Sequence, residues 1–307
     1  MKRSVTILTG ASLSICCLWV LGIVFSDRWA WSQWLAWIPT IVVLVLMLIA
    51  AIIAACTTLR LQMFVLSVIA GALFCWLTLI ENSLFHDSSA SGDLRIVGWT
   101  MSHPKKNISD QSALEVVQFD GDITLLTHGW YVRGELAINE WLGNDGHKLI
   151  SGPFTVLTKL QPIEVRTIIA SDGIYISLFV LDATPMLGRT ITMWAIDLPS
   201  NVGEPKMKVV ARTLRLLDKV NVPPPDIVVG DFNMTRNSVA MRTLFPSLHD
   251  ASDDSASGWL ASYPRTLPIY HIDHTLISDT LIAINYKLIN PHLGRHRVQL
   301  TELKRID

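Results

Sequence analysis

The stretch that decides the fold is Asp226-Ile-Val-Val-Gly-Asp-Phe-Asn233. Its first half is rich in β-branched residues and predicts a buried strand. Its second half, from Gly230, predicts a tight turn that exposes the carboxylate of Asp231 and the carboxamide of Asn233. Such a pair can hold a hard metal ion and a phosphate oxygen together. Alone the pattern is not specific, because Asx side chains often bond their own backbone where a strand ends.

Further strands and helices are predicted on both sides of this stretch. The spacing of Ser112 and Glu115 is that of a capping box and predicts the start of a helix with Leu114 and Val117 on one face. An amphipathic helix is predicted over 206–220. Strands are predicted over 94–99, 122–126, 174–181, 191–196, 272–277, 282–289 and 298–303. This mixture indicates layered packing of helices and sheets.

The hydrophobic excess of the chain lies in its first 82 residues. The 307 residues are 50% hydrophobic and 17% charged, against roughly 25% charged in an ordinary soluble domain. Three transmembrane helices are predicted at about 5–25, 37–56 and 63–80, each near the roughly 20 apolar residues that cross a bilayer. The first apolar run is too long for a signal peptide. Trp29, Trp31, Trp34 and Trp37 are interpreted as an interfacial belt and not as a ligand cage.

The positive charges that flank these segments predict their orientation. Lys2 and Arg3 precede the first span, Arg60 separates the second from the third, and the loop between the first two has only Arg28. The positive-inside rule then places the N-terminus in the cytoplasm, so the C-terminal domain lies outside it. We therefore expect an integral protein of a plasma or inner membrane, with the lipid bilayer as a partner.

The remainder is predicted to be a linker at 83–93, rich in Ser, Gly and Asp, and one domain at 94–307. All four cysteines lie in the hydrophobic segments, so the domain has no disulfide. The formal net charge of −1 gives no sign of nucleic-acid binding. Together with the expected location, it argues against chromosomal DNA as a substrate. The sequence leaves the oligomeric state open.

Two later segments make the first motif specific. They are Ser262-Tyr263-Pro264 with Ile272-Asp273-His274, and Gly294-Arg295-His296-Arg297. In this order and spacing the motifs resemble the endonuclease/exonuclease/phosphatase superfamily of metal-dependent phosphoesterases, including a membrane-anchored branch. The resemblance covers about 94–303. It implies an α+β fold in which three transmembrane helices precede a four-layer α/β sandwich of two packed β-sheets flanked by helices.

The resemblance also implies roles for four matching residues. Asp231 would align and deprotonate the attacking water, and Asn233 would bind the scissile phosphate. Asp273 matches a supporting acidic position close to the site. His296 matches the terminal histidine, which stabilises the phosphate in the transition state and contacts metal. The expected cofactor is a divalent metal, Mg²⁺ or Mn²⁺.

Four positions depart from the family pattern. Thr100 stands near a metal-binding Asn position, His128 near a metal-binding Glu, Asp197 replaces a phosphate-side His, and Arg295 replaces an acid that orients the terminal His. The loss of that acid is expected to weaken His296. His128 and Asp197 amount to an exchange of acid and imidazole between strand ends that should face each other.

Two interpretations of these departures stay open. In one, a rebuilt site of His128, Asp197 and Asp231 holds Mn²⁺ or Zn²⁺, with Arg295 and Thr100 on the substrate, and hydrolyses phosphate esters. In the other, the protein is a catalytically inactive module that binds a phosphorylated ligand or a protein. Nucleic acid, phospholipid and sugar phosphate are not distinguished by fold.

Overall fold

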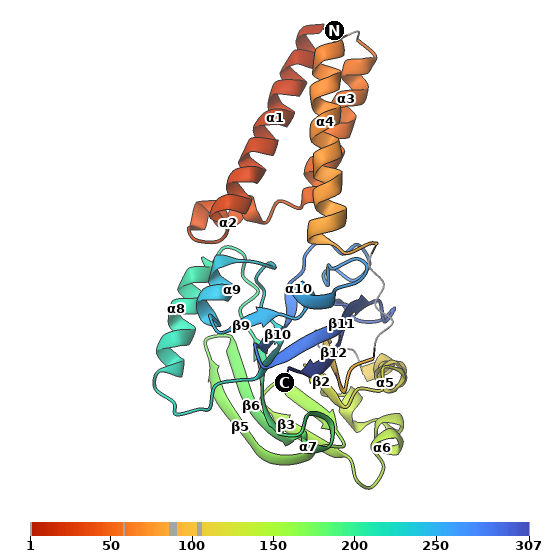
Figure 1. The fold of residues 1–307 in the computed structure, drawn as a ribbon, viewed down its shortest axis with the longest axis vertical. Coiled ribbons are helices and arrows are strands. Elements are labelled where there is room, and N and C mark those ends of the chain that lie inside the picture. The colour runs from red at the N-terminus through yellow and green to blue at the C-terminus, as the bar shows by residue number, and fades with distance from the viewer. Residues whose placement is uncertain (1, 58, 86–90, 103–105, 307) are drawn as a thin grey trace.

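Apolar helices at the N-terminus form a bundle that projects from the rest of the protein (Figure 1). We analysed a computed structural model that describes residues 2–57, 59–85, 91–102 and 106–306. Within these residues, Arg3–Phe25 and Arg60–Glu81 are long and apolar enough to cross a membrane, and a bent helix pair makes a third candidate if it counts as one span. The bundle consists of α1 (Lys2–Phe25), α2 (Ala30–Ala36), α3 (Thr40–Ala55), α4 (Arg60–Trp76) and the π-helix η1 (Leu77–Glu81).

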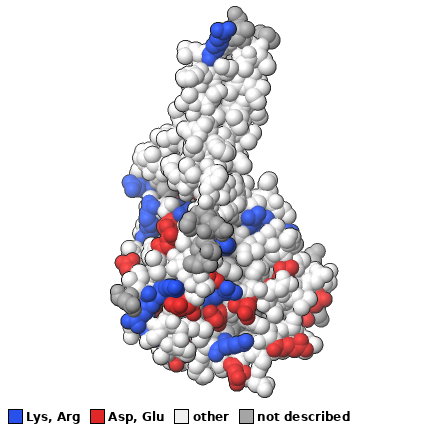
Figure 2. Space-filling model, turned by 45° about the vertical axis from the view of Figure 1, so that its right-hand side comes forward, with Lys and Arg blue, Asp and Glu red and all other residues white. Residues whose placement is uncertain are grey.

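The second predicted span differs most from its prediction. Residues 30–36, which were predicted to lie in the loop before this span, form the separate helix α2, and this helix meets α3 at 63°. Pro39 occupies the N-cap of α3, because proline suits the start of a helix but not its interior. On the face drawn in Figure 2, charged residues of both signs lie on the domain, only Lys or Arg lies near the far tip of the bundle, and the upper shaft between them shows no charged residue.

The C-terminal part contains two six-stranded mixed sheets. The first has the order β11-β12-β1-β2-β4-β3 and the second β5-β6-β7-β8-β10-β9. The strands of the first are β1 (Leu94–Thr100), β2 (Ile123–Thr127), β3 (His147–Ser151), β4 (Phe154–Thr158), β11 (Leu281–Ile289) and β12 (Val298–Arg305). Those of the second are β5 (Gln161–Ser171), β6 (Ile174–Asp182), β7 (Thr190–Asp197), β8 (Ile227–Asp231), β9 (Leu248–Asp250) and β10 (Asp273–Ser278).

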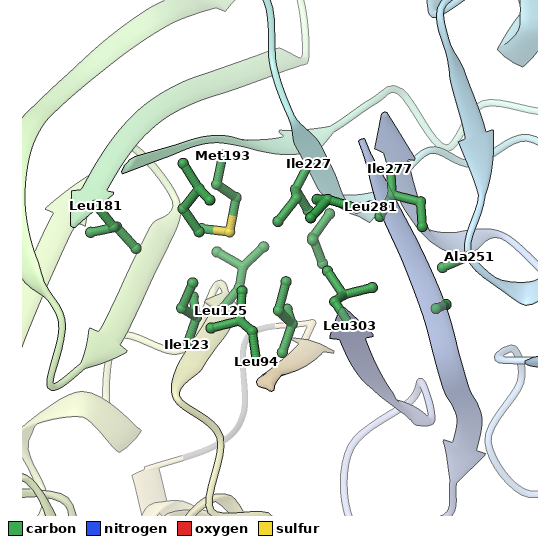
Figure 3. Packing of buried hydrophobic residues seen from close by; sticks show 14 of the residues in the cluster. Leu94, Ile123, Leu125, Leu181, Met193, Ile227, Ala251, Ile277, Leu281 and Leu303 are labelled. Atoms are coloured by element: carbon green, nitrogen blue, oxygen red, sulfur yellow. The ribbon is translucent and has the colours of Figure 1, made fainter. Parts of the chain in front are cut away.

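The two sheets pack face to face, and helices cover both outer faces. Leu94, Ile123 and Leu125 of the first sheet meet Met193 and Ile227 of the second (Figure 3). Alternate residues of the same strands point outward. The outer face of the first sheet packs against α5 (Ser109–Gln118) and α6 (Leu136–Leu142), and that of the second against α8 (Lys206–Leu217) and α9 (Val239–Leu244). This arrangement confirms the predicted sandwich.

Shorter helices connect these layers. They are η2 (Lys106–Ile108), η3 (Val132–Gly134), α7 (Thr184–Leu187) and α10 (Ser252–Ser255). The predicted start of α5 is wrong: the helix begins at Ser109, and the hydroxyl of Ser112 donates to the carbonyl of Ile108 one turn earlier. Leu114 is 55% exposed, because small residues such as Ala113 form the buried face instead.

Candidate active site

Strand register brings the predicted acidic residues together. β7 and β8 are parallel and pair Asp197 with Asp231, while β10 runs antiparallel to β8 and pairs Asp273 with Asp231. β1 and β2 are also parallel, so Thr100 and His128 end or follow two neighbouring strands of the facing sheet. All of these except Asp273 line one cleft with a volume of about 730 Å³, which Asn233, Arg295 and His296 also line.

The motif that decides the fold needs its glycine. Gly230 has φ 148°, and a Cβ at this position would lie 1.9 Å from the carbonyl oxygen of Ile196 on β7. Asn233 has φ 50°, a left-handed conformation that asparagine adopts more readily than most residues. Its backbone N–H donates to Asp231 Oδ1 at 3.0 Å, and its Nδ2 donates to the carbonyl of Leu198 at 2.9 Å. These bonds fix Asn233 and leave one N–H of its carboxamide for a ligand.

A buried relay orients His296. Its Nδ1 lies 2.8 Å from Asp273 Oδ2, and the hydroxyl of Thr100 donates to Asp273 Oδ1 at 2.6 Å. The hydroxyl of Ser262 accepts a bond from the backbone N–H of Asp273 at 3.2 Å. The prediction that His296 lacks an orienting carboxylate is therefore wrong, because a neighbouring strand supplies the acid. Thr100, which was predicted to contact substrate, lines the cleft, and its hydroxyl donates a hydrogen bond to Asp273.

The surroundings of His296 and Asp231 raise the pKa of both side chains. Burial disfavours the charged form of His296, but the charge and hydrogen bond of Asp273, with Asp231 and Asp197, raise its pKa to about 9. Burial, followed by repulsion from Asp273, raises the pKa of Asp231 well above its usual value, although His296 opposes this. His296 is thus a cation at neutral pH, beside a carboxylate whose raised pKa makes it a stronger base.

His128 and Asp197 face each other, as predicted from their exchange of side-chain types. His128 Nε2 lies 2.9 Å from Asp197 Oδ2. His128 has φ 59° directly after β2, and its backbone N–H donates to the carbonyl of Pro153 at 2.8 Å. Arg295 is exposed on the cleft, where its guanidinium can reach a bound anion.

The residues of the cleft fit a divalent metal. Asp231, Asp273 and His296 offer ligand atoms within 4.8 Å of one another. Both oxygens of Asp273 already accept hydrogen bonds, and a protonated imidazole is no ligand, so Asp231 is the member of this trio best placed to bind. Asp273 and Asp197 repel the negative charge of buried Asp231, and a bound cation would offset this repulsion. The histidine His128 adds a nitrogen donor close to Asp197.

Four aromatic residues of the cleft were not predicted as site residues. Tyr263 lies with its ring centroid 4.9 Å from that of His296, and Tyr270 lies 5.2 Å from Trp37. Trp34 and Trp37 come from the N-terminal helical bundle and line the cleft as well. The interpretation of the tryptophans as an interfacial belt thus describes only part of their surroundings. Ser262 and Tyr263 carried a signal, since they belong to the quoted motif, whereas no local pattern linked Trp34 to the site.

A second buried group lies outside the cleft, under α10. Asp250, His271 and His274 also offer ligand atoms within 4.8 Å of one another. His274 donates from Nδ1 to Asp250 at 2.7 Å and from Nε2 to the carbonyl of Met234 at 3.0 Å. Both ring nitrogens are donors, so this histidine is an imidazolium paired with a carboxylate. The ring of His271 stacks on that of His274 at 4.5 Å.

We expect Asp250→Asn to lower the free energy of unfolding by about 3–5 kcal/mol, because it leaves a buried imidazolium without its carboxylate. Burial would raise the pKa of Asp250, but the hydrogen bond and charge of His274 hold it below the usual range. The carboxylate therefore stabilises the fold above the unfolded pKa of about 4, and this is lost as pH falls toward the folded value. Thermal unfolding of the detergent-solubilised chain measures the effect. Asp279→Asn, at an exposed carboxylate, is the matched control, and equal melting of both variants would contradict the assignment.

Comparison with known proteins rests on structure. No protein-family model matches the chain, and no curated protein matches its sequence. An endonuclease/exonuclease/phosphatase protein of Bacteroides vulgatus has a TM-score of 0.51 at 12% identity, covering 69% of this chain and 99% of that one. A mannosyl-6-phosphatase of Bacteroides thetaiotaomicron has 0.51 at 12%, covering 68% and 99%. A humanised TDP2 of D. rerio has 0.50 at 13%, covering 68% and 97%. The C-terminal part of this chain thus has the fold of the endonuclease/exonuclease/phosphatase family proteins.

Proposed function

We propose that this protein is a membrane-anchored hydrolase of phosphate esters. The observation that carries the proposal is the relay from Thr100 through Asp273 to His296, set beside the buried carboxylate of Asp231 in one cleft. A fixed cation and a strong carboxylate base are the two groups that attack of water on a phosphate ester requires. Structural neighbours that include a protein named as a phosphatase support this chemistry.

In the proposed reaction, Asp231 takes a proton from a water molecule as the water oxygen bonds to phosphorus. The ester P–O bond breaks, the leaving alkoxide takes a proton from solvent water, and Asp231 returns its own proton to solvent. A phosphodiester and water thus become a phosphomonoester and an alcohol. His296, the free N–H of Asn233 and the guanidinium of Arg295 stabilise the negative charge that develops on the phosphoryl oxygens.

The proposal includes a divalent metal. Asp231 and Asp197 would hold it, with His128 as a nitrogen ligand in exchange for its bond to Asp197. When bound, the metal would neutralise charge on the phosphoryl group and lower the pKa of a bound water. Mixed oxygen and nitrogen donors suit Mn²⁺ or Zn²⁺ better than Mg²⁺, which prefers oxygen ligands.

We also place the protein in a plasma or inner membrane with its domain outside the cytoplasm. The start of α1, the end of α3 and the start of α4 lie at the end of the bundle remote from the domain (Figure 1). Three crossings would put the N-terminus and the domain on opposite sides of the membrane. The distribution of Lys and Arg predicts that the N-terminus is on the cytoplasmic side.

Turnover of a soluble phosphodiester by the full-length chain in detergent tests the proposal. We expect hydrolysis in the presence of Mn²⁺ or Zn²⁺ and its loss on chelation. Asp231→Ala and His296→Ala are expected to remove it. If no metal supports turnover above these two variants, the protein is a silent phosphate-binding module, and equilibrium binding of inorganic phosphate becomes the property to measure.

A further inference from the structure

The membrane anchor forms part of the wall of the cleft. Trp34, in α2, and Trp37, at its C-terminal end, line the cleft together with the catalytic side chains. The ring of Trp37 packs against Tyr270, which lines the same cleft from the domain. A ligand that fills this cleft would therefore contact the anchor as well as the domain.

Buried hydrogen bonds fasten the anchor to the domain at this position. Gln33 is 2% exposed; its Nε2 donates to the carbonyl of Val202 at 2.8 Å, and its Oε1 accepts the backbone N–H of Lys206 at 2.7 Å. Asp27 accepts the N–H of Ala240 at the start of α9 at 3.0 Å. Both polar side chains are buried and form hydrogen bonds across the junction, so the position of the cleft relative to the anchor is fixed.

The cleft lies at the edge of the apolar helices. Trp37 precedes Thr40, the first residue of α3, by three residues, which span at most about 11 Å. A headgroup layer is about 5–7 Å thick on each side of the hydrocarbon. Trp29 and Trp31 are about half exposed on the same turn and helix, as indoles at headgroup level are. The mouth of the cleft is thus within reach of headgroups.

Charge selects among the phosphate esters that could enter. The described lining includes the carboxylates of Asp197 and Asp231 and one permanent cation, Arg295. A nucleic acid needs a basic track along successive phosphates, which this lining lacks. A single phosphate with an apolar neighbour matches it better, since Trp and Tyr side chains suit a surface that is apolar at one end and wet at the other.

We infer that the substrate is a phospholipid of the membrane in which the anchor sits, with its headgroup phosphodiester in the cleft and its acyl chains in the bilayer. This inference rests on the proposed hydrolase. It predicts that the anchor residues of the cleft contribute to turnover of lipid, although they are remote from the catalytic residues in sequence.

The test compares two substrates with one preparation. The full-length chain is reconstituted with the activating metal into vesicles of phosphatidylcholine and phosphatidylglycerol, and release of diacylglycerol or phosphatidic acid is measured beside hydrolysis of a soluble aryl phosphodiester and of a single-stranded oligonucleotide. Trp34→Ala is the variant, because Trp34 is exposed and its loss leaves the core intact. Trp31→Ala on the same helix is the matched control, since Trp31 does not line the cleft.

We expect lipid to be the preferred substrate, and Trp34→Ala to lower the ratio of lipid to soluble-diester turnover about tenfold, with no change for Trp31→Ala. If the soluble diester is hydrolysed and the lipid is not, the lipid assignment is wrong and the proposed hydrolase stands. The same follows if Trp34→Ala and Trp31→Ala have equal ratios of lipid to soluble-diester turnover. Faster cleavage of the oligonucleotide also overturns it. Failure to hydrolyse any of the three overturns the hydrolase and the lipid assignment together.

Discussion

Asp231→Asn is expected to lower kcat for phosphodiester hydrolysis by about 10²–10⁴-fold, the usual contribution of a general base. The substitution keeps the shape of the side chain and its hydrogen bond to the backbone of Asn233, so the turn after β8 stays intact. The proton acceptor is lost, together with one of the two carboxylates that we propose as metal ligands. Burial and the neighbouring carboxylates raise the pKa of Asp231, so it accepts a proton more strongly than an exposed aspartate.

Steady-state kinetics of the full chain measure this effect, with Asp279→Asn as a control far from the cleft. We expect the control to retain the wild-type kcat. A loss of less than about tenfold in Asp231→Asn would be too small for a general base and would assign proton removal to another group.

Asp273→Asn is expected to lower kcat by up to about 10⁴-fold, as loss of the analogous orienting aspartate does in a serine-protease triad. Asp273 holds His296 in its orientation and keeps it protonated. An asparagine at this position carries no charge and can present N–H to the ring nitrogen. The imidazole would then be neutral or misaligned when negative charge develops on the phosphate.

The pH profile separates this role from a merely structural one. A histidine with a pKa of about 9 stays protonated through neutral pH, so the alkaline limb of wild-type activity should lie near pH 9. Removing the negative charge of Asp273 lowers the pKa of His296, so the alkaline limb should move to lower pH. Thr100→Val, which removes one hydrogen bond to Asp273 and no charge, should leave the limb in place. An unmoved limb in Asp273→Asn would contradict the relay.

The strand and helix patterns predicted layered packing, and the polar motifs after the central strands carried the resemblance that implied the sandwich. β8 is buried along its length and runs into Asp231 and Asn233, so a local pattern carries both fold and site. The strands β3, β4, β5 and β9 were not predicted. β5 alternates weakly and is largely exposed, so its residues lack the periodicity of a half-buried strand.

The partner of His296 could not be predicted by position in the motif. The residue before His296 in the sequence is Arg295. We predicted the loss of an orienting acid from this neighbour alone. In space, Asp273 supplies the acid from β10, because strand pairing places it beside Asp231. Long-range pairing of this kind leaves no local trace. The same holds for Trp34, which reaches the cleft through packing of the N-terminal bundle on the domain.

The most direct test of the account is hydrolysis of a phosphodiester by the reconstituted full-length chain in water labelled with the heavy oxygen isotope. Mass spectrometry of the products shows which bond has broken. The account predicts one labelled oxygen on the phosphomonoester, none on the alcohol, and labelled product that forms about 10²–10⁴-fold more slowly with Asp231→Asn than with the wild type. Label on the alcohol, or equal labelled product from wild type and Asp231→Asn, would contradict attack of water on phosphorus at this cleft.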